Sequence, residues 1–246
     1  MVKRKYGLIK QTKDPRDYKL KQLLSVHGAV VLPTSVDLRK SCPAIYDQGE
    51  LGSCTANAGV AARVMLDKIK VQLSRLFLYY QERVIEGDVS QDGGAQMRDI
   101  GKALSTYGVC PETDEPYNAA KFTVKPSATA VKDALAYKIK SYYSVPDTNG
   151  IKQVLALKAQ PVLSGILVYE SFESATVAKT GIIPMPAKKE KLLGGHAICI
   201  VGYDDSKSWF ICRNSWGASW GDKGYFYLPY TYFNGKLASD FWVLQN

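Results

Sequence analysis

A chain of 246 residues, 46% hydrophobic and 22% charged, is long enough for one large domain or two halves around a shared cleft, and its composition excludes a disordered protein. The formal net charge is +9, but the basic residues are spread out and form neither a stripe nor a known motif, which argues against a nucleic-acid partner. No apolar run approaches the roughly 18 residues that span a bilayer, so no membrane partner is expected.

Residues 1–31 are read as an N-terminal extension. They are charged throughout and lack the apolar core of about 7 to 15 residues that a secretory signal requires. This fits a cytoplasmic or virion-associated protein, and equally a chain from which a signal was removed, so the compartment is left open. His27 is interpreted as a solvent-facing residue of this extension.

Residues 32–135 are predicted to be mainly helical. Apolar residues recur at helical spacing in "CTANAGVAARVMLDKIK", "SRLFLYYQERV" and "AQMRDIGKALSTYGV", which are separated by turns rich in glycine and aspartate. Cys54 stands at the start of the first helix, directly after Gly52 and Ser53. A helix N-terminus favours the thiolate form of a cysteine, so Cys54 is a candidate nucleophile.

Residues 136–246 are predicted to form mainly antiparallel strands. Short runs rich in Val, Ile, Tyr and Phe, such as "QPVLSGILV", "GHAICIVGYDD", "SWFICRNSW" and "GYFYLPY", are broken by Pro, Gly, Asp and Ser. One helix is predicted around "GIKQVLALKA". Asp204, Asp205 and Ser206 are interpreted as a hairpin turn rather than a catalytic carboxylate pair.

Five cysteines and two histidines limit the chemistry. The cysteines form no CxxC pair, and two histidines are too few for a His-based metal site, so no metal and no cofactor is expected. Cys199 and Cys212 lie in apolar strand-like runs and are interpreted as buried inert thiols. Cys42 and Cys110 each precede proline in loops, and a disulfide between them is left open. One cysteine and one histidine are what thiol nucleophilic catalysis needs.

Three motifs, in the order "DQGELGSC", "GGHAICIVGYDD" and "CRNSWGASWGDKGYFYL", resemble the papain family of cysteine peptidases from "LPTSVDLRK" at residue 32 onward. The interval from Cys54 to His196 falls within the roughly 130 to 150 residues typical of that family. The resemblance implies an α+β fold of two subdomains, with the active site in the cleft between them. Residues 32–135 would be the helical half that carries the nucleophile, and residues 136–246 an antiparallel β-barrel-like half that carries the histidine and the asparagine.

The resemblance also implies a role for each catalytic residue. Cys54 would attack as a thiolate, and His196 would take the thiol proton and later deliver it to the leaving amine. Asn214 would orient the imidazole. Gln48 and the backbone N–H of Cys54 would form the oxyanion hole.

The expected substrate contacts follow from the same resemblance. The glycine turn "QDGGAQ" would pair with the substrate backbone, and small or aliphatic walls predict a hydrophobic side chain at the second residue before the scissile bond. Trp216 would shield the catalytic hydrogen bond from water, and for Trp220 packing and a surface role stay equally open. The expected substrate-binding residues are Gly93, Gly94, Ala95, Ile166, Gly194, Gly195 and Trp216, with Leu237 or Ala238 as a further wall.

Three positions depart from the common family pattern. Leu51 and Thr55 stand where the family usually has a cysteine and an aromatic residue, so the usual cleft disulfide cannot form, and the motifs are more similar to the bacterial, archaeal and viral branch. Gly195 stands where many relatives carry Asp or Asn, which would alter the pH profile.

The expected function is hydrolysis of peptide or protein substrates through a thioester. Two alternatives are left open: a catalytically silent binding module of the same fold, and a transpeptidase or ligase that passes the thioester to an amine. Residues 1–31 are shorter than the family's usual propeptide. They are expected either to lie across the cleft as an intramolecular inhibitor or to pack on the surface.

Overall fold

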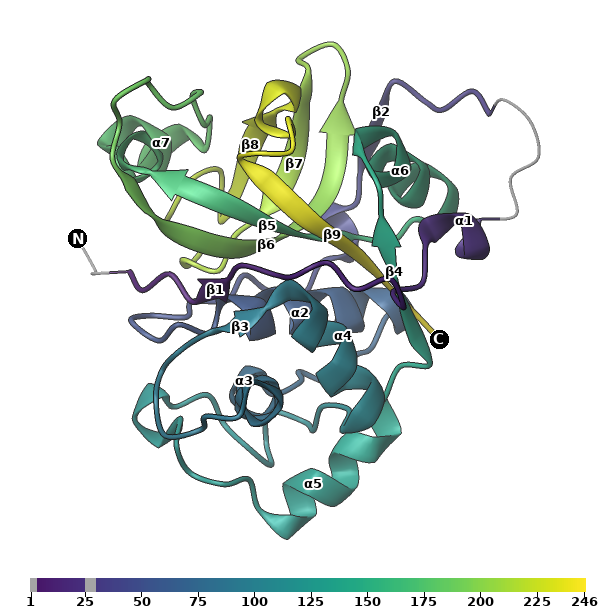
Figure 1. Ribbon diagram of the computed structural model, residues 1–246, viewed down its shortest axis with the longest axis vertical. Helices are drawn as coiled ribbons and strands as arrows, with labels where there is room; N and C mark the ends of the chain where they lie inside the picture. The colour runs from purple at the N-terminus through teal and green to yellow at the C-terminus, as the bar shows by residue number, and fades with distance from the viewer. Residues whose placement is uncertain (1–3, 25–29) are drawn as a thin grey trace.

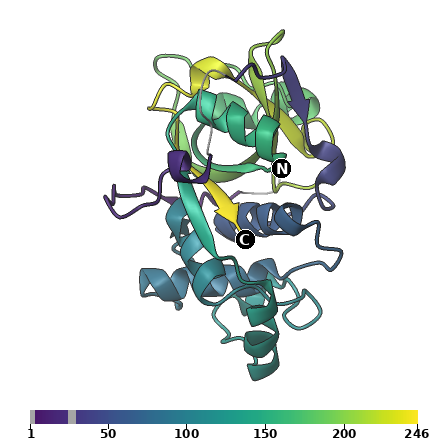
Figure 2. The ribbon, with the colours of Figure 1, turned by 90° about the vertical axis from the view of Figure 1, so that its right-hand side faces the viewer.

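The structure of the protein, a computed structural model, describes residues 4–24 and 30–246. A helical region and a strand region lie one against the other (Figure 1), and a view from the side shows the same division (Figure 2). His27 lies outside the described residues. None of the described helices has the length and apolar character needed to cross a membrane.

The helical region contains α2 (Cys54–Asp67), α3 (Arg75–Glu86), α4 (Met97–Thr106) and α5 (Ala128–Ala134). The hydroxyl of Ser74 caps α3 by accepting the Phe77 N–H at 3.0 Å, and Gly87, with φ of 85°, ends it in the left-handed conformation. Helix α2 is buried along most of its length because it packs against both α3 and the strand region. Its small residues permit this close packing, since a Cβ built on Gly59 would lie 2.5 Å from Ile100.

The strand region is an antiparallel sheet that runs β4–β9–β5–β6–β7–β8, with β2 paired to β6. Its path is open, so the barrel-like half expected from the sequence is a curved sheet rather than a closed barrel. The turn predicted at 204–206 is present between β6 and β7 but comprises residues 205–208, because Asp204 is the last residue of β6; the Ser206 N–H donates to Asp204 at 2.9 Å. The strands are β2 (Ser35–Asp37), β4 (Ser141–Val145), β5 (Val162–Tyr169), β6 (Leu192–Asp204), β7 (Trp209–Arg213), β8 (Tyr225–Pro229) and β9 (Ala238–Gln245).

Two hydrophobic cores fix the cleft. One lies between α2, α3, α4 and the sheet and includes Val60, Leu78 and Leu163. The other lies within the strand region, around Phe172 and Phe210. The helix predicted around "GIKQVLALKA" is present as α6 (Thr148–Gln153) and a following π-helical turn, while α7 (Ala175–Thr180) packs near the second core.

The five cysteines are all free thiols in the structure, so Cys42 and Cys110 form no disulfide. Cys199 and Cys212 are buried in β6 and β7, as predicted. Burial raises the pKa of the Cys110 thiol to about 12, and the pKa of Cys212 is also raised by burial. These two thiols are therefore unreactive at neutral pH.

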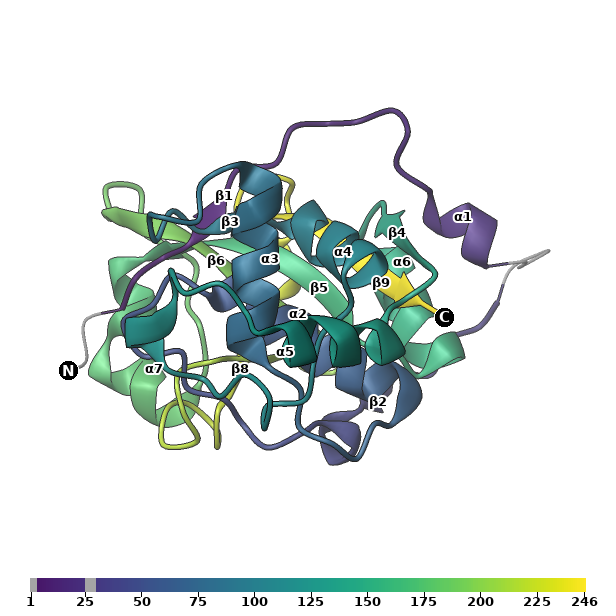
Figure 3. The ribbon, with the colours of Figure 1, turned by 90° about the horizontal axis from the view of Figure 1, so that it is seen from below.

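The N-terminal extension crosses the boundary between the two regions. Its strand β1 (Leu8–Ile9) pairs in parallel with β3 (Ala95–Gln96), and α1 (Leu20–Leu23) follows beside β4. Seen from below, the segment around β1 runs along β3 before it reaches α1 (Figure 3). Of the two arrangements that the sequence left open, the described part of the extension adopts the one that lies across the cleft.

Candidate active site

Cys54 begins α2 and is fully buried. The turn before it is held in several places: the Gly52 N–H donates to Asp92 at 3.1 Å, and the Asn57 side chain donates to the Ser53 carbonyl at 2.9 Å. Helix α2 packs against β6, and the backbone N–H of Ala197, the residue after His196, lies close enough to the thiol to act against the rise of its pKa. The fold therefore brings the thiol at the start of α2 next to the histidine of β6.

His196 and Asn214 form a buried pair. The Nε2 atom of His196 lies 2.9 Å from Oδ1 of Asn214, which also accepts the Ser215 N–H at 2.8 Å. Because the amide oxygen can only accept, Nε2 carries the proton of the neutral ring. The other ring nitrogen, Nδ1, is buried and has no hydrogen-bond partner among residues 4–24 and 30–246. It is therefore the atom that can take up a proton.

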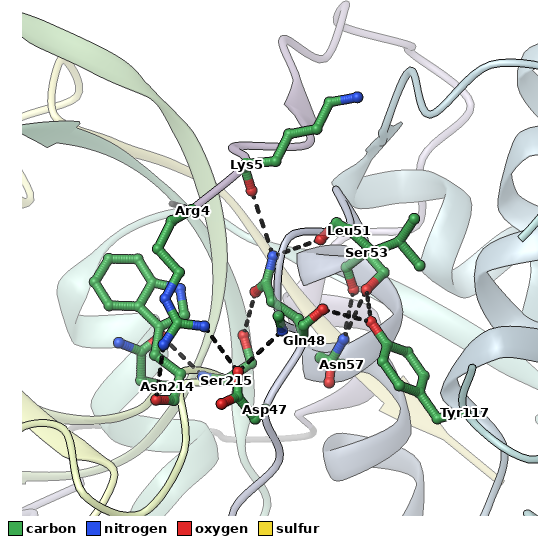
Figure 4. A network of polar contacts seen from close by, with 12 residues as sticks. Arg4, Lys5, Asp47, Gln48, Leu51, Ser53, Asn57, Tyr117, Asn214 and Ser215 are labelled. Carbon is green, nitrogen blue, oxygen red and sulfur yellow. Dashed lines mark hydrogen bonds and ion pairs between the residues drawn. The ribbon is translucent and has the colours of Figure 1, made fainter. Parts of the chain in front are cut away.

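Gln48 has its side-chain amide fixed by neighbouring groups (Figure 4). The Ser215 hydroxyl donates to Oε1 of Gln48 at 2.6 Å, so the Nε2 end of the amide points away from Ser215. Nε2 then donates to the Leu51 carbonyl at 3.0 Å and to the Lys5 carbonyl at 3.4 Å. Ser215 was not predicted from the sequence, although its place between Asn214 and Trp216 in "NSWG" was a usable signal.

Burial keeps the thiol and the imidazole uncharged in this structure. It raises the pKa of Cys54 to about 11, although hydrogen bonds from the Ala197 and Gly7 N–H groups act in the opposite direction. It lowers the pKa of His196 to about 4, against the opposing effect of the Asn214 hydrogen bond. At neutral pH the covered site therefore holds a thiol and a neutral imidazole rather than an ion pair.

The N-terminal extension covers the site. Its backbone comes closest to the neighbouring residues at Gly7, which lies between Gly52 and Gly94. The Gly7 carbonyl accepts the Ala95 N–H at 2.9 Å. A Cβ built on Gly7 would lie 1.8 Å from the Gly52 carbonyl oxygen, and one built on Gly94 would lie 1.9 Å from the Gly7 oxygen. Only glycine fits at position 7 in this arrangement.

Leu8 fills the cleft at the position where the sequence placed a hydrophobic pocket. It lies against Gly165 and Gly195, since Cβ atoms built there would approach its side chain to 2.8 and 3.2 Å, and it pairs with Ala95. Ile166 points into the second core instead. The expectation that Ile166 lines this pocket is therefore corrected to Gly165, because neighbouring residues of a strand face opposite sides.

The other expected substrate-binding residues divide between this pocket and its surroundings. Gly94, with φ of 83°, lies against Gly7, whereas a Cβ built on Gly93 would meet nothing within 4 Å. Gly194 lies against Tyr6 rather than Leu8. Ala238 is buried opposite Ile166 on β9 and belongs to the second core.

The two tryptophans pack together beside the imidazole. The ring of Trp216 lies 5.1 Å from that of His196 and 4.9 Å from that of Trp220. Trp220 stacks on Phe172 at 5.7 Å and contacts Phe226, so packing is its role in this structure.

Thr55, one of the departures from the family pattern, connects helix α2 to buried carboxyl groups. Its hydroxyl donates to Glu82 at 2.6 Å. Burial raises the pKa of Glu82 well above its ordinary value. Burial, followed by the neighbouring Glu86 carboxyl group, which favours the protonated form of Asp99, raises the pKa of Asp99 to about 7. These carboxyl groups hold protons at pH values where ordinary carboxylates are charged.

The raised pKa of Asp99 predicts a pH-dependent stability. Its ordinary value is 3.8, so its stabilising contribution is complete below that value and is lost as pH rises through about 7. We expect Asp99→Asn to reduce the fall in the free energy of unfolding over this interval, measured by urea denaturation at a series of pH values. The exposed Glu50→Gln variant is the control. Equal pH slopes for Asp99→Asn and wild type would contradict this role of Asp99.

Comparison with known proteins gives consistent matches over nearly the whole chain. Residues 32–239 match the family described as "Papain family cysteine protease". An uncharacterized peptidase C1-like protein of Acanthamoeba polyphaga mimivirus is 38% identical over 99% of this chain and 88% of its own length. Ananain of Ananas comosus is 31% identical over 80% of this chain and 56% of its own length.

Solved structures show the same fold. The crystal structure of Xylellain, a cysteine protease from Xylella fastidiosa, superposes with a TM-score of 0.88 at 39% identity, covering 100% of this chain and 98% of that one. The ragweed cysteine protease Amb a 11, solved in its proform, gives a TM-score of 0.68 at 25% identity, covering 88% of this chain and 66% of that one.

Proposed function

Because this chain belongs to the papain family of cysteine proteases, we propose that Cys54, His196, Asn214 and Gln48 are its catalytic residues. The observation that carries this proposal is the buried His196–Asn214 hydrogen bond of 2.9 Å, next to a thiol at the N-terminus of α2. A base whose ring is oriented by a third group, beside a nucleophile, is the arrangement that thioester chemistry requires.

The reaction can be assigned to these atoms in two halves. In the first, Nδ1 of His196 takes the thiol proton and the Cys54 sulfur attacks the peptide carbonyl carbon. The carbonyl oxygen becomes an oxyanion that accepts from the Cys54 N–H and from Nε2 of Gln48. The proton on Nδ1 passes to the leaving amine as the C–N bond breaks, which leaves a thioester. In the second half, His196 takes a proton from water as the water oxygen attacks the thioester carbonyl carbon. The C–S bond then breaks, the peptide acid leaves, and the proton on Nδ1 returns to the sulfur to re-form the thiol.

A hydrophobic side chain is proposed at the second residue before the scissile bond. Leu8 of the extension supports this preference, because it lies between Gly165 and Gly195, beside Ala95. The absence of side chains on both glycines leaves room for a branched aliphatic group and offers no side-chain hydrogen bond.

We propose further that the extension inhibits the enzyme intramolecularly. It covers Cys54, which is fully buried, and its Gly7 backbone lies against Gly52 in the turn before that thiol. A buried thiol is out of reach of a peptide substrate, so the segment blocks the site while it is in place. Because position 7 admits only glycine, we expect a Gly7→Ala substitution to displace the segment and to leave the rest of the chain intact.

The oxyanion role of Gln48 is tested by Gln48→Ala in the Gly7→Ala background. We expect peptide hydrolysis to fall about 10²- to 10³-fold in kcat, the usual effect of losing one such donor. Alkylation of Cys54 by iodoacetamide creates no oxyanion in that hole and should keep its rate. Ser215→Ala, which removes the group that orients the amide, should lower hydrolysis less. Equal hydrolysis by Gln48→Ala and its parent would exclude the role.

The two alternatives left open by the sequence are separated by product analysis. A peptide cleaved in the presence of an added amine acceptor yields free acid if water attacks the thioester, and the amide if the enzyme is a transferase. We expect the free acid. Failure of a peptidyl epoxide to modify Cys54, even in Gly7→Ala, would indicate the silent binding module.

A further inference from the structure

The side chains of three consecutive residues of the extension each contact a different carboxylate around the cleft. Arg4 pairs with Asp47 at 2.7 Å, and Lys5 pairs with Asp92 at 2.8 Å. Tyr6 donates its hydroxyl to Glu173. The mouth of the cleft at this end is acidic, although the chain as a whole carries a net charge of +9.

Tyr6 lies on the opposite side of Gly7 from Leu8, so if Leu8 marks the pocket for the second residue before the scissile bond, Tyr6 marks the side from which the leaving amine departs. Its ring centroid is 6.3 Å from that of His196 and 6.2 Å from that of Trp216, edge-on in both cases. Gly194 makes room for it, because a Cβ there would lie 2.6 Å from the Cβ of Tyr6. Trp216 is held in turn by Phe172, at 5.5 Å. Tyr6 thus lies in a formed site with one aromatic wall.

Arg4 occupies the neighbouring position on the same tryptophan. Its guanidinium carbon lies 5.6 Å from the Trp216 ring centroid, and its second nitrogen donates to the Trp216 carbonyl at 3.1 Å. The side chain of Arg4 is only 13% exposed, although its partner Asp47 is 54% exposed. A cation is therefore well accommodated between Trp216 and Asp47.

The carboxylates at this end depend on the extension for their partners. Within the part of the chain that the structure describes, the cations within 4 Å of Asp47 and Asp92 are Arg4 and Lys5. Among the same residues, Tyr6 is the one side chain that hydrogen-bonds to Glu173. Asp92 keeps bonds from Tyr79 and the Gly52 N–H when the extension leaves, but Glu173 keeps none of its side-chain bonds. Release of the extension therefore exposes unpaired negative charge beside Trp216.

We infer that Glu173, assisted by Asp47, forms a leaving-side subsite on Trp216 that selects a tyrosine, lysine or arginine side chain directly after the scissile bond. This inference rests on the proposed peptidase function and assigns its substrate class as peptides with basic or phenolic leaving segments. Lys and Arg supply cationic donors to the carboxylate, and Tyr supplies a neutral donor of the size already seated there. Phe fits the same space without a donor, and Glu is repelled.

The selection is tested on the full-length Gly7→Ala chain with quenched-fluorescent peptides. The peptides carry Leu at the second position before the scissile bond and differ only in the residue after it. We expect kcat/KM for Tyr, Lys and Arg to exceed that for Ala by about tenfold or more, since a hydrogen bond to a charged group contributes that much. The Phe peptide should be cut more slowly than the Tyr peptide, and the Glu peptide slowest of all.

Two substitutions at Glu173 separate charge from shape. Glu173→Gln should bring the Lys and Arg peptides close to the Ala peptide and leave the Phe peptide unchanged, because the ring still packs on Trp216. Glu173→Lys should make the Glu peptide better than the Lys peptide. Glu170→Gln is the matched control, since Glu170 is an exposed carboxylate on the same turn, and the wild-type order should persist there.

A binding measurement makes the test independent of turnover. The Cys54→Ala, Gly7→Ala double variant should bind a fluorescein-labelled Tyr or Lys peptide more tightly than the Ala peptide, and Glu173→Gln should remove the difference. Equal kcat/KM and equal binding for all peptides would overturn the subsite and leave the peptidase proposal standing. Selective binding without any hydrolysis would keep the subsite and overturn the peptidase proposal.

Discussion

Replacing Cys54 by alanine is expected to abolish peptide hydrolysis in the Gly7→Ala background, with a loss of about 10⁴-fold or more in kcat/KM. A thioester requires a thiol, so the loss falls on the chemical step and spares substrate binding. The fold should persist, because the thiol is buried at the first position of α2 and alanine removes one sulfur atom from a helix end already fixed by Asn57 and Asp92.

The matched controls are the other buried thiols. Cys199→Ala and Cys212→Ala remove sulfur from β6 and β7 and should cost some stability, but they should keep hydrolysis. A peptidyl epoxide should label the parent at Cys54 by mass spectrometry and should not label Cys54→Ala. Full activity of Cys54→Ala, or labelling transferred to Cys199 or Cys212, would remove Cys54 from the mechanism.

Much of the fold could be predicted because its patterns are local. Helical spacing located α2, α3 and α4, and short β-rich runs located β5 to β8. The catalytic candidates were found because each stands in a motif whose residue order matched a known family. The position of Cys54 at a helix start was visible from the glycine and serine before it and the alanine-rich run after it.

The pocket that Leu8 occupies was harder to predict because it depends on the register of the strands. A displacement of one residue along a strand turns a side chain to the opposite face, and the sequence predicts Ile166 where Gly165 faces the cleft. The residues that contact Leu8 also come from separate elements, β3, β5 and β6. The hydrophobic periodicity of a single segment cannot show which residues of different segments come into contact.

The contacts of the N-terminal extension were even harder to predict from the sequence. Its strand β1 has two residues, and its partner β3 also has two, so neither produces a recognisable alternation. Their parallel pairing places Leu8 beside Ala95, although most of the helical region's sequence lies between the two residues. The Thr55–Glu82 hydrogen bond is likewise a contact between two helices. The sequence shows that Thr55 departs from the family pattern, but only the packing of the helices shows that its hydroxyl donates to Glu82.

Gly7→Ala in the otherwise wild-type chain is expected to release the active site. Overpacking typically costs about 1–3 kcal/mol, which shifts the balance between covered and open states roughly 5- to 150-fold. The rate of Cys54 labelling by iodoacetamide at neutral pH should rise by a factor in this range. Lys10→Ala, an exposed position of the same extension, should label at the wild-type rate. Unchanged labelling in Gly7→Ala would show that the extension does not limit access.

The pH dependence of that release distinguishes opening from a simple gain in accessibility. In the covered site, burial holds the pKa of Cys54 at about 11 and that of His196 at about 4, so near neutral pH neither group is charged and little thiolate exists. When the extension leaves, water reaches both groups, the pKa of the thiol falls and that of the imidazole rises, and the two charges stabilise each other. Labelling of Gly7→Ala should therefore persist to lower pH than labelling of wild type, whose rate should keep rising toward alkaline pH. If the labelling rates of Gly7→Ala and wild type showed the same pH dependence and differed only by a constant factor, the extension would block the reagent without controlling the ionisation of Cys54 and His196.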